Sequence, residues 1–184
     1  MASELGYGQP MGGIAQTAFI VPNLHEAIGR WVTDMRAGPF FVLPNFLVPG
    51  QTYRGEESRA DITIAMGFAG HMLIELIQPL DDKPSIYKEM RERSGYGFHH
   101  VAKIRSDVRQ LAKTYEAKGQ ATVFHSPTPG GGEVFFVEGG EHAPGYIELV
   151  EDCEPTRAIF EHVWRASLDW KGDRPVRDFL ELLK

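Results

Sequence analysis

The stretch QTAFIVPNL, residues 16–24, aligns without a gap with HVAKIRSDV, residues 100–108, which lies 84 positions later. Each copy is typical of a short strand followed by a polar residue that can cap a helix, Asn23 in the first copy and Ser106 or Asp107 in the second. The residues after each cap recur at the spacing of one helical face. These apolar positions are Leu24, Ala27, Ile28, Trp31, Val32 and Met35, and then Val108, Leu111, Ala112 and Tyr115.

Three further strands follow each predicted helix. They cover residues 39–43, 60–66 and 72–77 in the first half, and residues 122–125, 134–137 and 146–150 in the second. The order strand, helix, three strands therefore occurs twice. It predicts an α+β fold of two βαβββ modules, residues 13–80 and 97–151, that together form one domain, residues 13–151.

The remaining segments connect or follow the two modules. A linker, residues 81–96, can form a short helix over residues 83–94. The extension at residues 152–184 begins near Pro155, which ends the preceding strand, and continues with the apolar spacing of one more helix. We expect this helix to pack on the sheet or on a second subunit, and a mobile lid over a pocket is the alternative.

The composition favours small-molecule chemistry. With 184 residues, a formal net charge of −6 and no cluster of Lys and Arg, the chain lacks the basic surface that nucleic acid or an anionic membrane would need. No apolar run approaches the roughly 20 residues that span a bilayer. A single cysteine, Cys153, cannot form an internal disulfide, and residues 1–13 lack a basic segment followed by an apolar one. We therefore expect a cytoplasmic protein that acts on a small molecule.

Two glutamates lie inside apolar strands. Glu75 is part of LIELI, residues 73–77, and Glu148 is part of YIELV, residues 146–150, so both faces of each strand are expected to be covered. An ionised carboxylate buried without a partner is strongly unfavourable, which leaves an Arg or Lys, a proton or a metal cation as the partner. Neither strand contains a basic residue. Because both glutamates end equivalent modules and one module begins at His100, a metal cation is the favoured partner.

The alignment of the two modules completes a predicted metal site. Gln16 stands in register with His100, so its amide oxygen is a candidate ligand. The predicted set of mostly oxygen donors suits a divalent ion such as Zn, Co, Ni or Mn. Because neighbouring residues of a strand point to opposite faces, His99 is expected on the outer face or in a hydrogen-bonded loop. The four predicted ligands are Gln16, Glu75, His100 and Glu148.

Aromatic and basic residues in the longer loops of the first module are candidates for substrate binding. The candidates are Phe41, Phe46, Tyr53 and Arg54. Core packing explains Phe41 equally well, and an arginine in a loop such as Arg54 faces solvent more often than it binds a substrate.

The doubled module and four phrases resemble the vicinal oxygen chelate superfamily, which includes glyoxalase I, methylmalonyl-CoA epimerase, extradiol dioxygenases and antibiotic-resistance binding proteins. The phrases are QTAFIVPNL (16–24), IELIQPLDD (74–82), GFHHVA (97–102) and GYIELV (145–150). The resemblance covers residues 13–151 and implies a metal held in a cup between the modules by the four predicted ligands. The set Gln, Glu, His, Glu is similar to that of eukaryotic glyoxalase I. The phrasing around Glu75 and His100 is similar to that of methylmalonyl-CoA epimerases, which usually have histidine at the position of Gln16.

The resemblance also implies a reaction. It points to a metal-dependent isomerase, epimerase or glyoxalase-type lyase that moves a proton on a small carbonyl or acyl compound through a metal-stabilised enolate. Glu148 is then the expected base, and Glu75 the expected acid on the second face. A homodimer is implied as well. The alternative is a non-catalytic, resistance-type binding protein. An extradiol dioxygenase is disfavoured, because such enzymes need two histidines in register and this chain supplies one.

Overall fold

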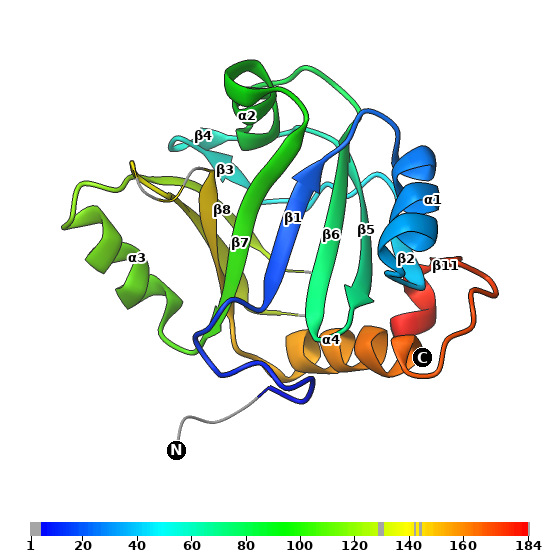
Figure 1. The fold of residues 1–184 in the computed structure, drawn as a ribbon. Helices are drawn as coiled ribbons and strands as arrows, with labels where there is room; N and C mark the ends of the chain where they lie inside the picture. The colour runs from blue at the N-terminus through cyan, green and yellow to red at the C-terminus, as the bar shows by residue number, and fades with distance from the viewer. Residues whose placement is uncertain (1–4, 129–130, 142, 144, 184) are drawn as a thin grey trace.

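The computed structural model describes residues 5–128, 131–141, 143 and 145–183, and Figure 1 shows their arrangement. The described residues form one eleven-stranded sheet in the order β11-β2-β5-β6-β1-β7-β10-β9-β8-β3-β4. The helices are α1 Leu24–Met35, α2 Ile86–Ser94, α3 Val108–Glu116, α4 Glu154–Ser167 and the 3₁₀ helix η1 Phe179–Leu183. The strands are β1 Gln16–Ile20, β2 Phe40–Leu43, β3 Thr52–Tyr53, β4 Glu56–Glu57, β5 Ile62–Ala69, β6 Met72–Pro79, β7 Gly97–Arg105, β8 Thr122–Pro127, β9 Glu133–Glu138, β10 Tyr146–Glu151 and β11 Val176–Asp178.

Two modules of the predicted kind build most of this sheet. The first is β1, α1, β2, β5 and β6, and the second is β7, α3, β8, β9 and β10. In each module the first strand pairs in parallel with the last, and the other neighbours pair antiparallel. β1 and β7 join the modules as antiparallel neighbours at the centre of the sheet. The predicted α+β class with two βαβββ modules is therefore confirmed.

Local signals place most of the helix ends. α1 has the predicted bounds, and the side chain of Asn23 accepts a hydrogen bond from the backbone amide of Glu26 at 3.1 Å. α2 begins three residues later than predicted, because the hydroxyl of Ser85 caps it. α3 begins after Asp107, whose carboxylate binds Arg105 at 2.7 Å and does not cap the helix. The predicted side-chain cap at this position is therefore wrong.

Alternation along the strands separates an outer face of the sheet from an inner face. Ile74 of β6 packs in the same cluster as Ile28 of α1. Leu149 of β10 packs in the same cluster as Val108 of α3. Figure 1 shows these two helices on opposite flanks of the central strands. The glutamate next to each of these strand residues therefore lies on the inner face.

Two extensions cover the edges of the double module. The long loop of the first module forms the hairpin β3–β4, and β3 pairs with β8 of the second module. From the C-terminal segment, β11 pairs in parallel with β2. Both pairings satisfy backbone groups that an edge strand would otherwise leave open.

The C-terminal helix α4 packs on the inner side of the sheet, as predicted. Pro155 occupies its first turn, where the missing backbone N–H of proline costs no helical hydrogen bond. Phe160 and Val163, with 7% and 0% exposure, belong to the same core cluster as Ile64 and Met66 of β5. The helix is therefore part of the folded core.

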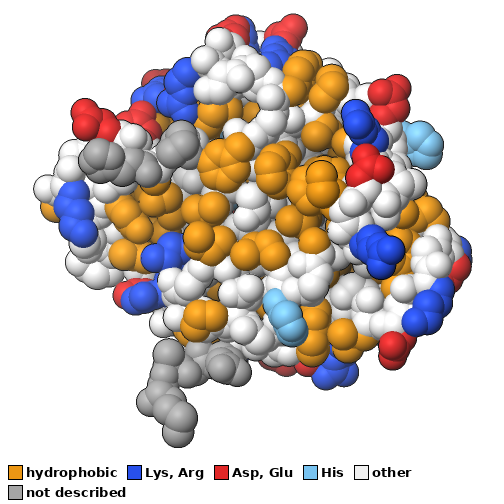
Figure 2. Space-filling view, viewed as in Figure 1, with side chains coloured by type: hydrophobic (Ala, Val, Ile, Leu, Met, Phe, Trp, Pro, Cys, Tyr) orange, Lys and Arg blue, Asp and Glu red, His pale blue; other side chains and the backbone are white. Residues whose placement is uncertain are grey.

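Apolar side chains gather over the central strands on the face shown in Figure 2. The ring of Phe19 on β1 lies 6.3 Å from that of Phe98 on β7 and 5.1 Å from that of Trp31 on α1. Phe98 is 36% exposed. The implied homodimer stays a prediction, for which this face offers apolar surface. Within the described residues, no helix combines the length and the apolar character that crossing a membrane requires.

Candidate functional site

The four predicted ligands meet on the inner face of the four central strands. Gln16 begins β1, Glu75 lies on β6, His100 on β7 and Glu148 on β10. Nε2 of Gln16 lies 3.1 Å from Oε2 of Glu75, 3.1 Å from Nε2 of His100 and 3.4 Å from Oε2 of Glu148. Nε2 of His100 lies 3.5 Å from Oε2 of Glu75 and 3.2 Å from Oε2 of Glu148. Side chains up to 132 positions apart therefore share one centre.

Two buried alanines make room for this cluster. Ala18 of β1 is paired with Glu75 on one side and with His100 on the other. Ala102 of β7 takes the equivalent place in the second module, between the other two members of the cluster. Both alanines are 0% exposed. Their small side chains leave the inner face free for the longer polar side chains beside them.

Burial changes the protonation of the three titratable members. It raises the pKa of Glu148 to about 8. Burial, followed by the charge of Glu148, raises the pKa of Glu75 well above its ordinary value. Burial also lowers the pKa of His100 to about 3. Without a cation, burial therefore favours the uncharged form of each of these three side chains. A divalent cation among them would favour the charged carboxylates instead.

The donor set fits a divalent cation. Ligands that lie about 2.1 Å from a common ion are roughly 3.0 to 3.4 Å from one another, and the contacts within the cluster are 3.1 to 3.5 Å. The Gln16 amide directs its nitrogen at the other members, and a half-turn of the amide would direct its oxygen there. Across the part of the chain that the structure describes, no group of three or more His, Cys, Asp and Glu side chains forms a metal site by itself. A metal site at this cluster therefore requires the amide of Gln16 as a fourth donor.

The sequence predicts His99 on the outer face or in a hydrogen-bonded loop, and this prediction is wrong. Ala18 of β1 pairs with His100, whereas Phe19 pairs with Phe98, so His99 is the extra residue of a β-bulge. The bulge breaks the usual alternation, and both histidines are buried, with 0% and 1% exposure. Nδ1 of His99 lies 2.7 Å from Nδ1 of His100. His99 therefore contacts the ring nitrogen of His100 that is remote from the shared centre.

A largely apolar cavity of about 200 Å³ includes the four polar side chains in its lining. Both modules contribute to the lining, and so does the C-terminal extension. From α4 come Thr156, Ile159 and Phe160, and from η1 come Phe179 and Leu183. The extension therefore forms a wall of the cavity.

The four predicted substrate-binding residues lie in different places. Phe46 lines the cavity. Phe41 is buried in the core at 1% exposure, because the C-terminal extension covers it and the guanidinium of Arg177 lies 5.7 Å from its ring. Tyr53 and Arg54 are carried to the far edge of the sheet by the pairing of β3 with β8. Phe41, Tyr53 and Arg54 are not among the described residues that line the cavity.

Sequence reasoning missed Tyr87, which reaches the cavity from the linker helix α2. Tyr87 is 8% exposed, lines the cavity and stacks on the ring of His99 with centroids 5.3 Å apart. Burial, followed by the charges of Glu75 and Glu148, raises the pKa of its hydroxyl well above the ordinary value. The hydroxyl is therefore a hydrogen-bond donor at neutral pH. The available signal was the helical spacing of the apolar residues Ile86, Tyr87 and Met90 in the linker.

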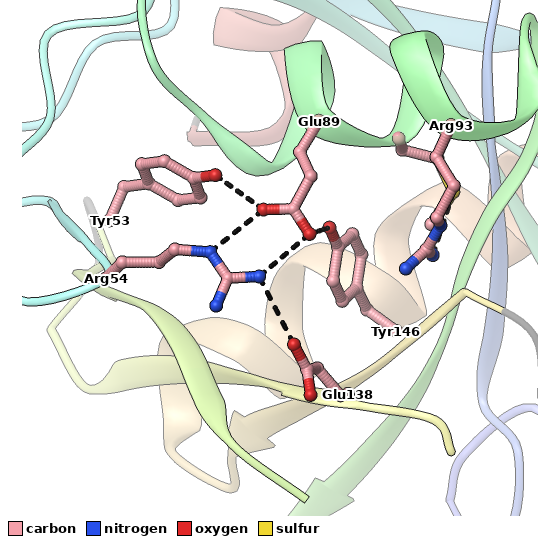
Figure 3. Close-up of polar contacts among 7 residues, drawn as sticks. Tyr53, Arg54, Glu89, Arg93, Glu138 and Tyr146 are labelled. Carbon is pink, nitrogen blue, oxygen red and sulfur yellow. Dashed lines mark hydrogen bonds and ion pairs between the residues drawn. The ribbon is translucent and has the colours of Figure 1, made fainter. Parts of the chain in front are cut away.

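Tyr53 and Arg54 belong to a polar cluster around Glu89 of α2 (Figure 3). Glu89 accepts hydrogen bonds from the hydroxyl of Tyr53, from Arg54 at 2.9 and 3.0 Å, and from the hydroxyl of Tyr146 at 3.0 Å. Tyr146 lies two residues before Glu148 on β10. The cluster therefore ties the β3–β4 hairpin and the linker helix to a strand of the site.

This cluster predicts stability that depends on acid pH. Burial would raise the pKa of Glu89, but hydrogen bonds from Arg54, Tyr53 and Tyr146 outweigh it and lower the pKa to about 2. Since this value lies below the unfolded pKa of about 4.3, the stabilisation is present above that unfolded value and is lost as pH falls from about 5 towards 2. We expect Glu89→Gln to reduce the unfolding free energy by about 1 to 2 kcal/mol at pH 7, and by less at pH 3, in urea denaturation.

Glu138→Gln is the matched control for this measurement. Glu138 also binds Arg54, at 3.2 Å, but its side chain is 36% exposed. We expect its replacement to change the unfolding free energy by less than about 0.5 kcal/mol at either pH. A loss in Glu89→Gln that is equal at pH 7 and pH 3 would contradict the electrostatic explanation.

The family model described as the glyoxalase/bleomycin resistance protein/dioxygenase superfamily matches residues 15–137. Curated protein sequences give no significant match. Methylmalonyl-CoA epimerase from Mycobacterium tuberculosis has a TM-score of 0.57 and 18% identity, over 86% of this chain and 96% of that chain. A hypothetical protein from Bacillus halodurans C-125 has a TM-score of 0.56 and 19% identity, over 77% of this chain and 94% of that chain.

A third similar structure is a variant of Streptomyces coelicolor methylmalonyl-CoA epimerase in complex with 2-nitronate-propionyl-CoA. It has a TM-score of 0.53 and 16% identity, over 78% of this chain and 96% of that chain. At such identities the three structures establish a shared fold. The family model covers more than half of the chain and includes Gln16, Glu75 and His100. The chain therefore belongs to the glyoxalase/bleomycin resistance protein/dioxygenase superfamily, the vicinal oxygen chelate proteins.

Proposed function

We propose that this protein is a metal-dependent isomerase, epimerase or glyoxalase-type lyase that moves a proton on a small carbonyl or acyl compound. The convergence of Gln16, Glu75, His100 and Glu148 in the lining of an apolar cavity carries the proposal. The family and the fold shared with methylmalonyl-CoA epimerases support the same class.

The four side chains would hold a divalent ion such as Zn, Co, Ni or Mn through imidazole, amide and carboxylate donors. When bound, the ion would polarise a substrate carbonyl and stabilise the negative charge that develops as the neighbouring carbon loses a proton. The apolar side chains around the cluster limit the access of water and so strengthen electrostatic interactions within it.

In this proposal Glu148 and Glu75 move the proton. Their strands, β10 and β6, lie on opposite sides of the central pair β1–β7, so the two carboxylates approach the centre from different modules. Each carboxylate directs its Oε2 at Nε2 of His100. The other oxygen of each carboxylate would then contact the substrate. Glu148 would accept the proton as a carboxylate, and Glu75, protonated when the substrate binds, would return one and become a carboxylate. Return to the opposite face gives epimerisation, and return to the neighbouring carbon gives isomerisation.

A non-catalytic binding protein of the resistance type is the second candidate. The observation that favours it is the pair of contacts from the amide nitrogen of Gln16 to both carboxylates, which hold the cluster together in the absence of a cation. Such a protein would bind its ligand in the same cavity, with no stoichiometric metal and no proton exchange.

One experiment separates the two candidates. The purified protein is loaded with Zn²⁺ or Co²⁺ and dialysed, and its metal content is measured by elemental analysis. It is then incubated in D₂O with small α-hydroxyketones and acyl thioesters while ¹H NMR follows the α-proton. We expect about one ion per chain and a loss of the α-proton signal that a chelator stops. A protein that binds these compounds without retaining an ion would be the binding protein.

A further inference from the structure

We infer that the substrate is uncharged and largely apolar apart from the oxygens at its reacting end, and that it carries no free carboxylate or phosphate near the reacting carbon. This inference rests on the proposed function and describes the same site further.

The charge of the cavity lining is the first argument. Among the described residues that line the cavity, Glu75 and Glu148 are the acidic side chains, and Lys and Arg are absent. The two acidic side chains offset the charge of a divalent ion, and no Lys or Arg of the described lining adds positive charge that would attract an anionic group. A carboxylate or phosphate on the part of the substrate remote from the ion would enter an apolar space without a basic partner and near two acidic side chains. Desolvation and repulsion both oppose its entry.

The arginines around the site are engaged elsewhere. Figure 3 shows the guanidinium of Arg54 directed at Glu89, which it binds at 2.9 Å. The guanidinium of Arg93 lies 5.6 Å from the centre of the ring of Tyr146. Neither arginine is part of the cavity lining. Pairing of either with an anionic substrate inside the cavity would require the present contacts to break.

The size and the walls of the cavity are the second argument. A volume of about 200 Å³ lies below the roughly 300 to 1,000 Å³ of sites for drug-sized ligands. A compact alkyl or aryl group therefore fits inside, whereas a large carrier such as a coenzyme would remain outside. A free hydroxyketone and the acyl end of a neutral thioester present the same chemistry to these walls. Side chains that form them include Ile62, Ile64, Met66, Phe124, Phe136 and Ile159.

A pair of ligands that differ by one carboxylate tests the inference. 2-Hydroxyacetophenone and 4-(hydroxyacetyl)benzoate carry the same vicinal oxygens, and only the second is an anion. Calorimetric titration of the Zn²⁺-loaded protein measures the affinity for each. We expect the neutral compound to bind at least about ten-fold more tightly, because the anion finds no counter-charge. Equal affinities, tighter binding of the anion or no binding of the neutral compound would overturn the inference.

A third ligand distinguishes the two sources of a neutral substrate. Phenylacetyl-pantetheine is an uncharged thioester with exchangeable α-protons. Faster α-proton exchange in this compound than in 2-hydroxyacetophenone identifies a thioester, and the reverse identifies a free carbonyl compound. Either result supports a neutral substrate when the affinity ratio of the matched pair is as expected.

A charge introduced into the wall should reverse the preference. Ile159 lines the cavity from α4, and the adjacent Ala158 is exposed. We expect Ile159→Arg to raise the affinity for 4-(hydroxyacetyl)benzoate, relative to the neutral compound, by at least about ten-fold. Ala158→Arg adds the same charge outside the cavity and should leave the ratio unchanged. An unchanged ratio in Ile159→Arg, in protein whose circular dichroism matches the wild type, would count against the inference.

Failure of the inference and failure of the proposed function give different results. If the protein retains no ion but still prefers the neutral compound at least ten-fold, the proton-transfer function fails and the neutral cavity stands. If it retains the ion and prefers the anion, the inference fails and the function stands.

Discussion

Glu148→Gln is expected to lower the metal-dependent rate of α-proton exchange by about 10²- to 10⁴-fold. Glutamine keeps the size of the side chain and one donor oxygen, but it cannot accept a proton at neutral pH. Glu148 faces the shared centre, with Oε2 at 3.2 Å from Nε2 of His100. The measurement is ¹H NMR in D₂O on protein loaded with Zn²⁺, with the metal content determined on the same sample.

Two further variants make this result specific. Glu151→Gln is the matched control, because Glu151 lies on the same strand, β10, but outside the cavity lining. It should keep the wild-type rate. Glu75→Gln should slow product formation more than exchange, because Glu75 is assigned the return of the proton. Undiminished exchange in Glu148→Gln with the ion bound would show that another group is the base.

Addition of Zn²⁺ is expected to raise the unfolding free energy by about 4 kcal/mol when the free ion exceeds its Kd a thousand-fold, because the ion binds the native state alone. His100→Ala should lose most of this gain, since it removes the imidazole from the centre of the cluster. Thermal denaturation with and without Zn²⁺ measures the effect. His25→Ala, which removes an exposed imidazole from α1, is the control and should keep the full gain.

His99→Phe should lose part of the same gain. A lone pair on Nε2 of His100 that faces the centre requires the proton on Nδ1, and Nδ1 of His99 lies 2.7 Å away to accept it. Loss of such a partner weakens metal binding by roughly 10- to 100-fold. His99→Asn, whose amide oxygen can accept the same proton, should restore part of the affinity. Equal stabilisation of the wild type and His100→Ala by Zn²⁺ would place the ion elsewhere.

Features encoded within a few residues could be predicted from the sequence. The copy of residues 16–24 at residues 100–108 was enough to infer two modules, because helix and strand periods act over short stretches. The bounds of α1 are as predicted, because the Asn23 cap and the apolar spacing after it are local signals. Glu75 and Glu148 could be singled out because apolar residues surround each of them in its own strand.

Features that depend on contacts between distant segments could not be predicted in this way. The inward side chain of His99 follows from a bulge in the pairing of β7 with β1, and pairing register is not written in either strand alone. Tyr87 lines the cavity because its ring packs against His99 and Phe124 of the second module.

The amino-acid sequence by itself determined the doubled βαβββ architecture and the four polar side chains that form the candidate site, since repetition and hydrophobic period are properties of the chain. Only the tertiary structure decided that the C-terminal extension lines the cavity, that β3 pairs with β8 of the second module, and that Tyr53 and Arg54 bind Glu89 outside the cavity. The physical reason is that each of these contacts is made between segments far apart in the sequence, whose pairing is selected by the packing of the whole molecule.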